Sequence, residues 1–191
     1  MHISSSPSQQ TMVSPERDAA SRAGVSPVVL GEPGLFLLAL VRIFFGLLWF
    51  QQLAWKMPPT FGGLRSYVLK EAAYTFVPGY SAILKHVFLT RFLLLGAGVW
   101  SAELLVGISL LFGLFTRLGA LLALVLSIQL FIGLAFAPGE WYWTYGMLVL
   151  LALVFVALPA GRRLGLDALL APRWYAARTR HRLARLLAWF V

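Results

Sequence analysis

The sequence "GAGVWSAELLVGISLLFGLFTRLGA", residues Gly96 to Ala120, contains one carboxylate, Glu103, in an otherwise apolar stretch. The stretch begins after Arg91 and ends at Arg117, with twenty-five residues between these two arginines. At about 1.5 Å per residue, a helix of this length is roughly 37 Å long and exceeds the ~30 Å hydrocarbon core of a bilayer. The stretch therefore predicts a membrane-spanning helix with an ionisable group near its middle.

The composition of the whole chain is typical of an integral membrane protein. Of its 191 residues, 60% are hydrophobic and only 12% are charged, and the mean hydropathy is +0.80. A soluble domain normally has about a quarter of its residues charged. The chain has no cysteine, which excludes disulfides, thiolate zinc sites and cysteine-ligated iron–sulfur clusters.

Apolar segments recur along the chain and predict an all-α fold, an integral membrane four-helix bundle. The predicted spans are residues 34–55, 87–115, 118–137 and 141–158, each long enough to cross a bilayer, the fourth only barely. Residues 1–32 are rich in Ser, Pro, Gln and Ala, and we expect a disordered N-terminal tail there. The bundle is therefore assigned to residues 33–171.

Two segments outside the spans have patterns of their own. The connection over residues 56–86 is long and aromatic, and we expect a short helix around residues 63–76 that folds over the outer mouth of the bundle. Residues 172–191 predict a basic amphipathic helix in the membrane interface, with a solvated basic tail as the alternative. Its apolar face is formed by Leu183, Leu186, Leu187 and Phe190, and its basic face by Arg178, Arg182 and Arg185.

The distribution of Lys and Arg predicts the orientation. If both termini are cytoplasmic, ten of these residues lie on that side and five on the other, as the positive-inside rule requires. Seven of the ten follow Pro159, and a basic tail beside a membrane favours anionic lipid headgroups over nucleic acid. We therefore expect a multi-pass protein with no nucleic-acid partner. The five outer residues are Lys56, Arg65, Lys70, Lys85 and Arg91.

Common membrane redox centres do not fit the sequence. A bis-histidine haem needs two histidines at membrane depth, and only His86 is near a span. The acidic residues near the membrane, Glu103, Glu140 and Asp167, are far apart in the sequence, which argues against a metal cluster. We expect no haem, metal or iron–sulfur cluster in this chain.

Polar residues inside the predicted spans are the candidates for chemistry. Because an ionisable group at mid-bilayer costs about 2.5–3.5 kcal/mol, we expect Glu103 to be paired within the bundle, and Arg42 is its natural partner. The pair is either a site for proton exchange or an ion pair that only fixes helix packing. Gln129 is expected to form an interhelical hydrogen bond. Gly96 and Gly107 would allow a neighbouring helix to approach closely.

Several of these residues, taken in order, carry a resemblance. Arg42 and Gly46, then Lys56, "AELLVGISLLFGLFTRLGA" and "AGRRLGLDALL" resemble the DoxX and DoxD group of small four-helix membrane proteins, and most of all DoxD-type subunits of thiosulfate:quinone oxidoreductases. The resemblance covers residues 34–171. It implies a prokaryotic plasma membrane, a quinone as cofactor and a partner subunit. The family-like residues are Arg42, Gly46, Lys56, Glu103, Gly107, Gly113, Arg117, Gly161, Arg162, Gly165 and Asp167.

The leading hypothesis is a membrane subunit of a quinone-linked redox complex, which oxidises thiosulfate or another small sulfur anion with its partner. Glu103 and Arg42 are the candidate catalytic residues, and Lys56 and Arg65 are candidates for binding an anionic substrate from outside. The alternative is a non-catalytic scaffold or accessory subunit of a larger respiratory or photosynthetic assembly. A small transporter is a weaker interpretation, because no inverted repeat is visible.

Overall fold

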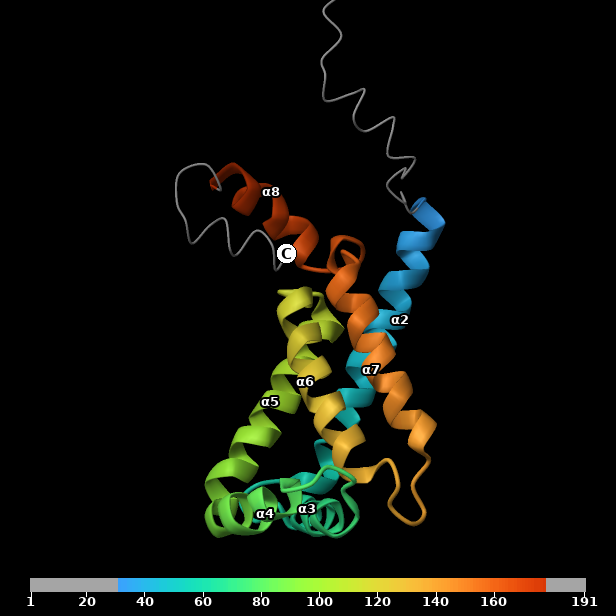
Figure 1. The fold of residues 1–191 in the computed structure, drawn as a ribbon. Coiled ribbons are helices and arrows are strands. Elements are labelled where there is room, and N and C mark those ends of the chain that lie inside the picture. Colours follow the sequence, from blue (N-terminus) through green and yellow to red (C-terminus); the bar gives the residue numbers. More distant parts are fainter. Residues whose placement is uncertain (1–30, 178–191) are drawn as a thin grey trace, which may run out of the picture. The chain divides into compact units, whose positions relative to one another are not determined.

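The computed structural model describes residues 31–177, and over this range the chain is helical and contains no strand. The predicted disordered tail, except for its last two residues, and the amphipathic pattern from Arg178 onward lie outside the described residues. The helices, drawn in Figure 1, are α2 (Glu32–Gln51), α3 (Gly62–Tyr74), α4 (Tyr80–Ile83), α5 (Phe92–Phe112), α6 (Thr116–Leu134), α7 (Tyr142–Ala157) and α8 (Asp167–Ala177).

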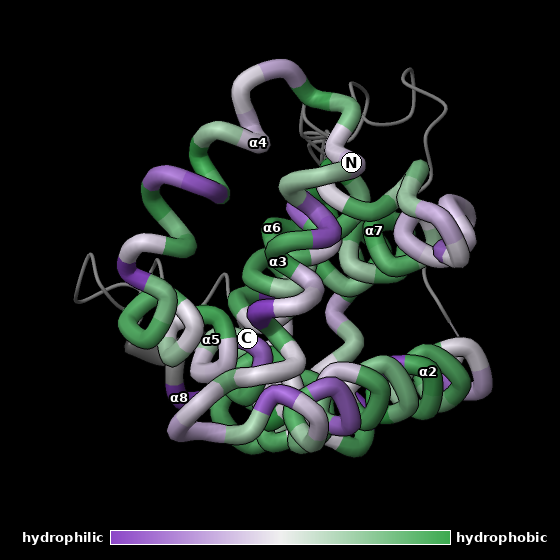
Figure 2. The backbone as a smooth tube through the Cα atoms, turned by 90° about the horizontal axis from the view of Figure 1, so that it is seen from below, coloured by the Kyte–Doolittle hydropathy of each residue, from purple (hydrophilic) through white to green (hydrophobic). Residues whose placement is uncertain are grey.

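Three helical segments are long and apolar enough to cross a membrane, namely Glu32–Lys56, Tyr80–Phe112 and Thr116–Leu134. The α7 helix is apolar but has 16 residues, which makes it about 24 Å long and shorter than the hydrocarbon core. Figure 2 shows mostly hydrophobic residues along α2, α6 and α7. The expectation of an all-helical chain with apolar helices that could span a membrane is confirmed.

Helices α2, α5, α6 and α7 share one apolar core. Large side chains of α2 and α7, including Phe45 and Phe155, pack against the small residues Ala120 and Ala123 of α6. The rings of Phe45 and Phe155 stack with their centroids 5.6 Å apart. This packing places four helices around the same buried cluster, although only three of them reach the length of a span.

Two glycines allow α2 and α5 to pack backbone against backbone. A Cβ atom at Gly46 would lie 2.6 Å from the backbone nitrogen of Leu111, and one at Gly107 would lie 3.3 Å from the backbone nitrogen of Phe50. The close approach predicted at Gly107 is confirmed. A Cβ atom at Gly96 would instead lie 3.5 Å from the side chains of Leu64 in α3 and of Phe61, which precedes α3.

The segment after α7 is tied to the turn between α5 and α6. The carboxylate of Asp167 accepts hydrogen bonds from the backbone N–H groups of Phe115, at 2.7 Å, and Thr116, at 2.9 Å. These groups lie at the start of α6, where a negative charge also suits the helix dipole. The backbone N–H of Asp167 donates in return to the carbonyl of Gly113, at 2.8 Å. Gly113 has a φ of 62°, which ends α5 three residues before the predicted Phe115.

The opposite end of the helices is covered by α3 and α4, as Figure 1 shows. The helix predicted around residues 63–76 is α3, and it packs through Leu64 and Val68 onto a second apolar cluster with Leu84 and Phe92. A π-helical turn, Leu84–Phe88, and a 3-10 turn, Leu89–Arg91, then lead into α5. This cover encloses the space in which the candidate site lies.

Candidate functional site

A cavity of about 690 Å³ lies between the covering segment of α3 and α4 and the ends of α2, α5, α6 and α7. Its volume is within the range of roughly 300–1,000 Å³ typical of small-molecule sites. Most of the lining is apolar or aromatic, with a few polar groups among it. The apolar lining includes Leu48, Trp49, Leu64, Val68, Val99 and Leu126.

One wall of the cavity carries a buried ion pair between Lys56 and Glu103. Lys56, in the 3-10 turn that follows α2, donates through Nζ to Oε1 of Glu103 on α5. The two side chains are 6% and 4% exposed. Oε2 of Glu103 is buried and has no hydrogen-bond partner among the described residues. An acceptor atom of a buried carboxylate is therefore left for a ligand or a water molecule that lines the cavity.

The predicted ion pair between Arg42 and Glu103 is wrong. Arg42 is fully buried in the middle of α2, and its side chain reaches the segment after α7, where Nη2 donates to the carbonyl of Leu164 at 2.8 Å and Nη1 to that of Ala160 at 3.3 Å. A Cβ atom at Gly113 would overlap Nη1, so this glycine makes room for the guanidinium. The rise per residue gives the depth of Arg42 and Glu103 along their helices. It does not show that the carbonyl groups of Ala160 and Leu164, after α7, accept the hydrogen bonds of Arg42.

The two candidate anion-binding residues also separate. Lys56 lines the cavity, whereas the guanidinium of Arg65 lies over the ring of Phe92, 5.5 Å from its centroid. Arg65 borders another, shallower groove together with Thr90 and Arg91. Of the four predicted site residues, the structure therefore brings together Lys56 and Glu103 and leaves Arg42 and Arg65 elsewhere.

A second carboxyl group, Glu71 of α3, lines the same cavity and is 3% exposed. Its Oε2 accepts hydrogen bonds from Nε2 of Gln129, at 2.5 Å, and from the hydroxyl of Tyr80, at 3.5 Å. No described Lys or Arg forms an ion pair with it. The interhelical hydrogen bond predicted for Gln129 is confirmed, because Gln129 belongs to α6.

Burial is the largest effect on the pKa of Glu71 and raises it to about 7. The hydrogen bonds from Tyr80 and Gln129 and the charge of Lys56 act in the opposite direction but are smaller. Gly133 on α6 makes room for this side chain, since a Cβ atom there would lie 2.6 Å from Cγ of Glu71. A carboxyl group without a cation partner in an apolar cavity is a candidate proton donor or acceptor.

A third polar group links α3 to the connection between α6 and α7. Lys70 donates to Oε1 of Glu140 at 2.6 Å, and the hydroxyl of Tyr145 donates to Oε2 at 2.7 Å. Burial would raise the pKa of Glu140, but the hydrogen bonds from Lys70 and Tyr145 and the charge of Lys70 outweigh it and lower the pKa. Glu140 therefore stays ionised and links Lys70 of α3 to Tyr145 of α7 at the edge of the cavity.

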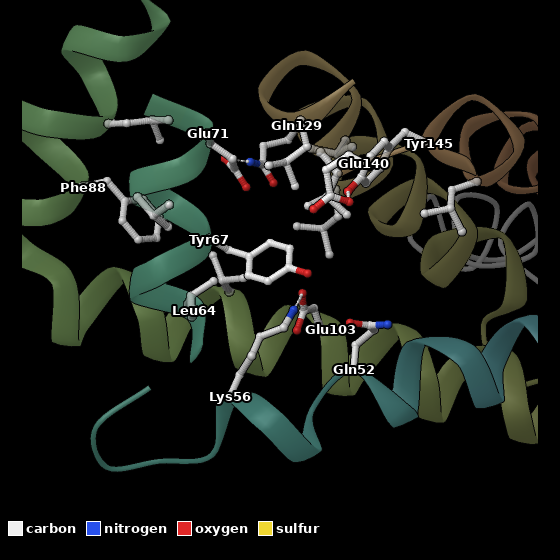
Figure 3. A pocket seen from close by; sticks show the side chains of 18 of the residues that line it. Gln52, Lys56, Leu64, Tyr67, Glu71, Phe88, Glu103, Gln129, Glu140 and Tyr145 are labelled. Carbon is white, nitrogen blue, oxygen red and sulfur yellow. Dashed lines mark hydrogen bonds and ion pairs between the residues drawn. The ribbon is translucent and has the colours of Figure 1, made fainter. Parts of the chain in front are cut away.

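Figure 3 shows how these groups face one another. Lys56 and Glu103 lie on one side of the cavity, Glu71 and Gln129 on the other, and the ring of Tyr67 extends between them. Neither Glu71 nor Tyr67 was singled out from the sequence. Both lie in "LRSYVLKEAAY", within the connection that was expected to fold over the outer mouth of the bundle, but its pattern does not show which side chains are buried. The signal that was present is the high aromatic content of this connection.

Within residues 31–177, no group of three or more His, Asp and Glu residues could hold a metal ion. Comparisons of the chain with family models, with curated proteins and with solved structures give no match. The resemblance to DoxX and DoxD proteins thus rests on the residues quoted for it alone.

Proposed function

We propose that this chain is a membrane subunit of a quinone-linked redox complex and that its cavity binds the quinone. The observation that carries the proposal is the buried Lys56–Glu103 pair at the edge of an apolar cavity of about 690 Å³. A quinone combines a polar ring with an apolar chain, and such a cavity matches both parts. When bound, a quinone supplies an acceptor for two electrons and two protons.

The residues present fit such a ligand. Lys56 has three N–H donors and uses one of them for Glu103, so its ammonium group is available to a carbonyl oxygen. The unpartnered Oε2 of Glu103 is available to a hydroxyl group of the reduced form. Ile83, Val87 and Val125 line the cavity and are also 56%, 49% and 62% exposed, so its apolar wall continues to the lipid-facing surface. A lipid-soluble ligand would enter by this route.

In this proposal electrons come from outside this chain, which contains no cysteine to hold an iron–sulfur cluster. We propose a partner subunit that carries the redox centre and oxidises thiosulfate or another small sulfur anion. Arg65 and Arg91 border a groove of about 780 Å³ at the α3 end, where such an anion would approach. In this proposal Lys56 binds the quinone in the cavity, and Arg42 stabilises the fold through its hydrogen bonds to the segment after α7.

The proposed setting is a prokaryotic plasma membrane, with α2, α5, α6 and α7 as a four-helix bundle and both termini in the cytoplasm. The shared core of these four helices supports the bundle, and the excess of Lys and Arg at the termini supports the orientation. The α3 end then faces outward, and the tail beyond the described residues meets anionic lipid headgroups.

Quinone binding can be measured on the full-length protein in quinone-free lipid nanodiscs. Trp49, Trp55 and Trp141 line the cavity, so a bound quinone would quench tryptophan fluorescence. We expect saturable quenching by an alkyl quinone, weakened about tenfold or more in Lys56→Met, because a charge-assisted hydrogen bond contributes about 1.5–3 kcal/mol. The control is Glu32→Gln, whose side chain is 70% exposed and pairs with Arg163.

The same titration separates this proposal from the scaffold alternative. Quenching that does not saturate and is equal in the wild type, Lys56→Met and Glu32→Gln would mean that the quinone only partitions into lipid. The chain would then be an accessory subunit, and a complex purified without it would retain full turnover.

A further inference from the structure

The cavity has a second polar contact that lies apart from the Lys56–Glu103 pair. Glu71 comes from α3 and Gln129 from α6, whereas Lys56 and Glu103 come from the end of α2 and from α5. Figure 3 shows the two groups across the cavity from each other, with Tyr67 between them. A ligand that touches both groups must carry polar atoms at two separated positions.

The chemistry of the two groups differs. Lys56 is paired with Glu103 and presents an ammonium donor beside a carboxylate acceptor. Glu71 has no ion-pair partner among the described residues, and the hydrogen bonds that it forms with them go to Oε2, which leaves Oε1 to face a ligand. A buried carboxyl group in this state favours its neutral form, in which it donates one hydrogen bond.

We infer that Glu71, in its protonated form, donates a hydrogen bond to one carbonyl oxygen of a para-quinone while Lys56 binds the other. This inference rests on the proposed function and adds a ligand class to it: a ring with two opposed carbonyl groups is preferred over a monoketone. Gln129 is the positioning residue, because its Nε2 holds the carboxyl group of Glu71 from α6.

The pH dependence of binding follows from the groups around Glu71. The titratable groups that act on it are Tyr80 from α4, Tyr145 from α7 and Lys56 after α2, while α6 contributes the neutral Gln129. Since burial raises the pKa of Glu71 to about 7, its donated hydrogen bond is lost as the pH rises through neutrality.

The test compares two ligands on the full-length protein in nanodiscs, an alkyl para-naphthoquinone and the matching alkyl tetralone, which has one carbonyl group. We expect the wild type to bind the quinone about tenfold more tightly at pH 6, the loss expected for one hydrogen bond to a ligand. In Glu71→Leu the two affinities should become equal. In Glu71→Gln, whose amide can still donate, the preference should remain but no longer fall between pH 6 and pH 8.

Two controls isolate Glu71. Glu103→Gln removes the carboxylate that pairs with Lys56 on the opposite side of the cavity and should keep the fall in affinity between pH 6 and pH 8. Infrared difference spectra should show the carbonyl band of a protonated carboxylic acid in the wild type at pH 6, absent in Glu71→Gln. This readout does not depend on any redox activity.

The outcomes separate this inference from the proposed function. If the wild type binds the quinone saturably but Glu71→Leu keeps the preference, or if the pH dependence persists in Glu71→Gln, the role of Glu71 is wrong and the quinone site stands. If the wild type binds neither ligand saturably, both proposals fail.

Discussion

Lys56 and Glu103, separated by 47 positions, form an ion pair whose side chains are only 6% and 4% exposed. The pair joins the turn after α2 to the middle of α5, at the edge of an apolar cavity. A buried pair of this kind costs desolvation energy on both sides, so each charge depends on the other. This dependence gives the first prediction.

Glu103→Gln and Lys56→Met should each lower the free energy of unfolding by about 3–5 kcal/mol, since each leaves one buried charge without its partner. The double variant should recover much of this loss. The measurement is a double-mutant cycle on the purified protein in mild detergent, by thermal or denaturant unfolding. A matched cycle of Glu103→Gln with Arg42→Gln should be additive, because these two side chains have separate partners. Additive losses for Lys56 and Glu103 would contradict the pairing.

The close approach of α2 to α5 predicts that Gly46→Ala destabilises the protein. The added methyl group would meet the backbone of Leu111, which cannot move aside as a side chain can. We expect a loss of about 1–3 kcal/mol, the usual cost of overpacking. Gly98→Ala is the matched control on α5, because a Cβ atom there would meet nothing within 4 Å. A loss of equal size in both variants would show that helix contact is not the cause.

The proposed orientation predicts the result of reporter fusions. A reporter placed after Val191 should be active only in a cytoplasmic form, and one inserted near Gly139, between α6 and α7, only in an exported form. The opposite result would turn the cavity and the α3 end toward the cytoplasm. An anionic substrate that approaches from outside would then be excluded.

Hydropathy predicts α2, α5 and α6 well, because the length of an apolar run can be compared directly with the thickness of the hydrocarbon core. The ends were less predictable: α5 stops at Phe112 because Gly113 adopts a positive φ that also makes room for Arg42. Gly113 can be recognised in the sequence as a residue that could end a helix, but its contact with the guanidinium of Arg42 cannot.

The candidate site was predicted only in part, because tertiary packing decides which of its residues are buried together. Glu103 was recognisable because a carboxylate in an apolar span needs a partner, yet Lys56 follows the span and was predicted to bind an anion from outside. Glu71 was missed because a carboxylate outside the apolar spans is ordinarily exposed, and only the packing of α3 over the other helices buries it. The sequence predicts that this connection covers the outer mouth of the bundle, but it does not show which side chains the cover buries.

The final prediction concerns the stability of the protein against pH. The pKa of Glu71 is raised from its ordinary value of 4.5 to about 7, chiefly by burial, so the folded state binds a proton that the unfolded state has lost between these values. Stability therefore falls as the pH rises from about 4.5 to about 7 and is unaffected by this group above that range. A shift of this size corresponds to a contribution of about 3 kcal/mol.

In Glu71→Gln this contribution should be absent, while Nε2 of Gln129 can still donate to the amide oxygen of the new side chain. The measurement is the difference in unfolding free energy between wild type and Glu71→Gln at several pH values, which cancels the other carboxylates. Curves that stay parallel from pH 4.5 to pH 7 would show that Glu71 is ionised in the folded protein, and the neutral hydrogen-bond donor in the cavity would be lost with it.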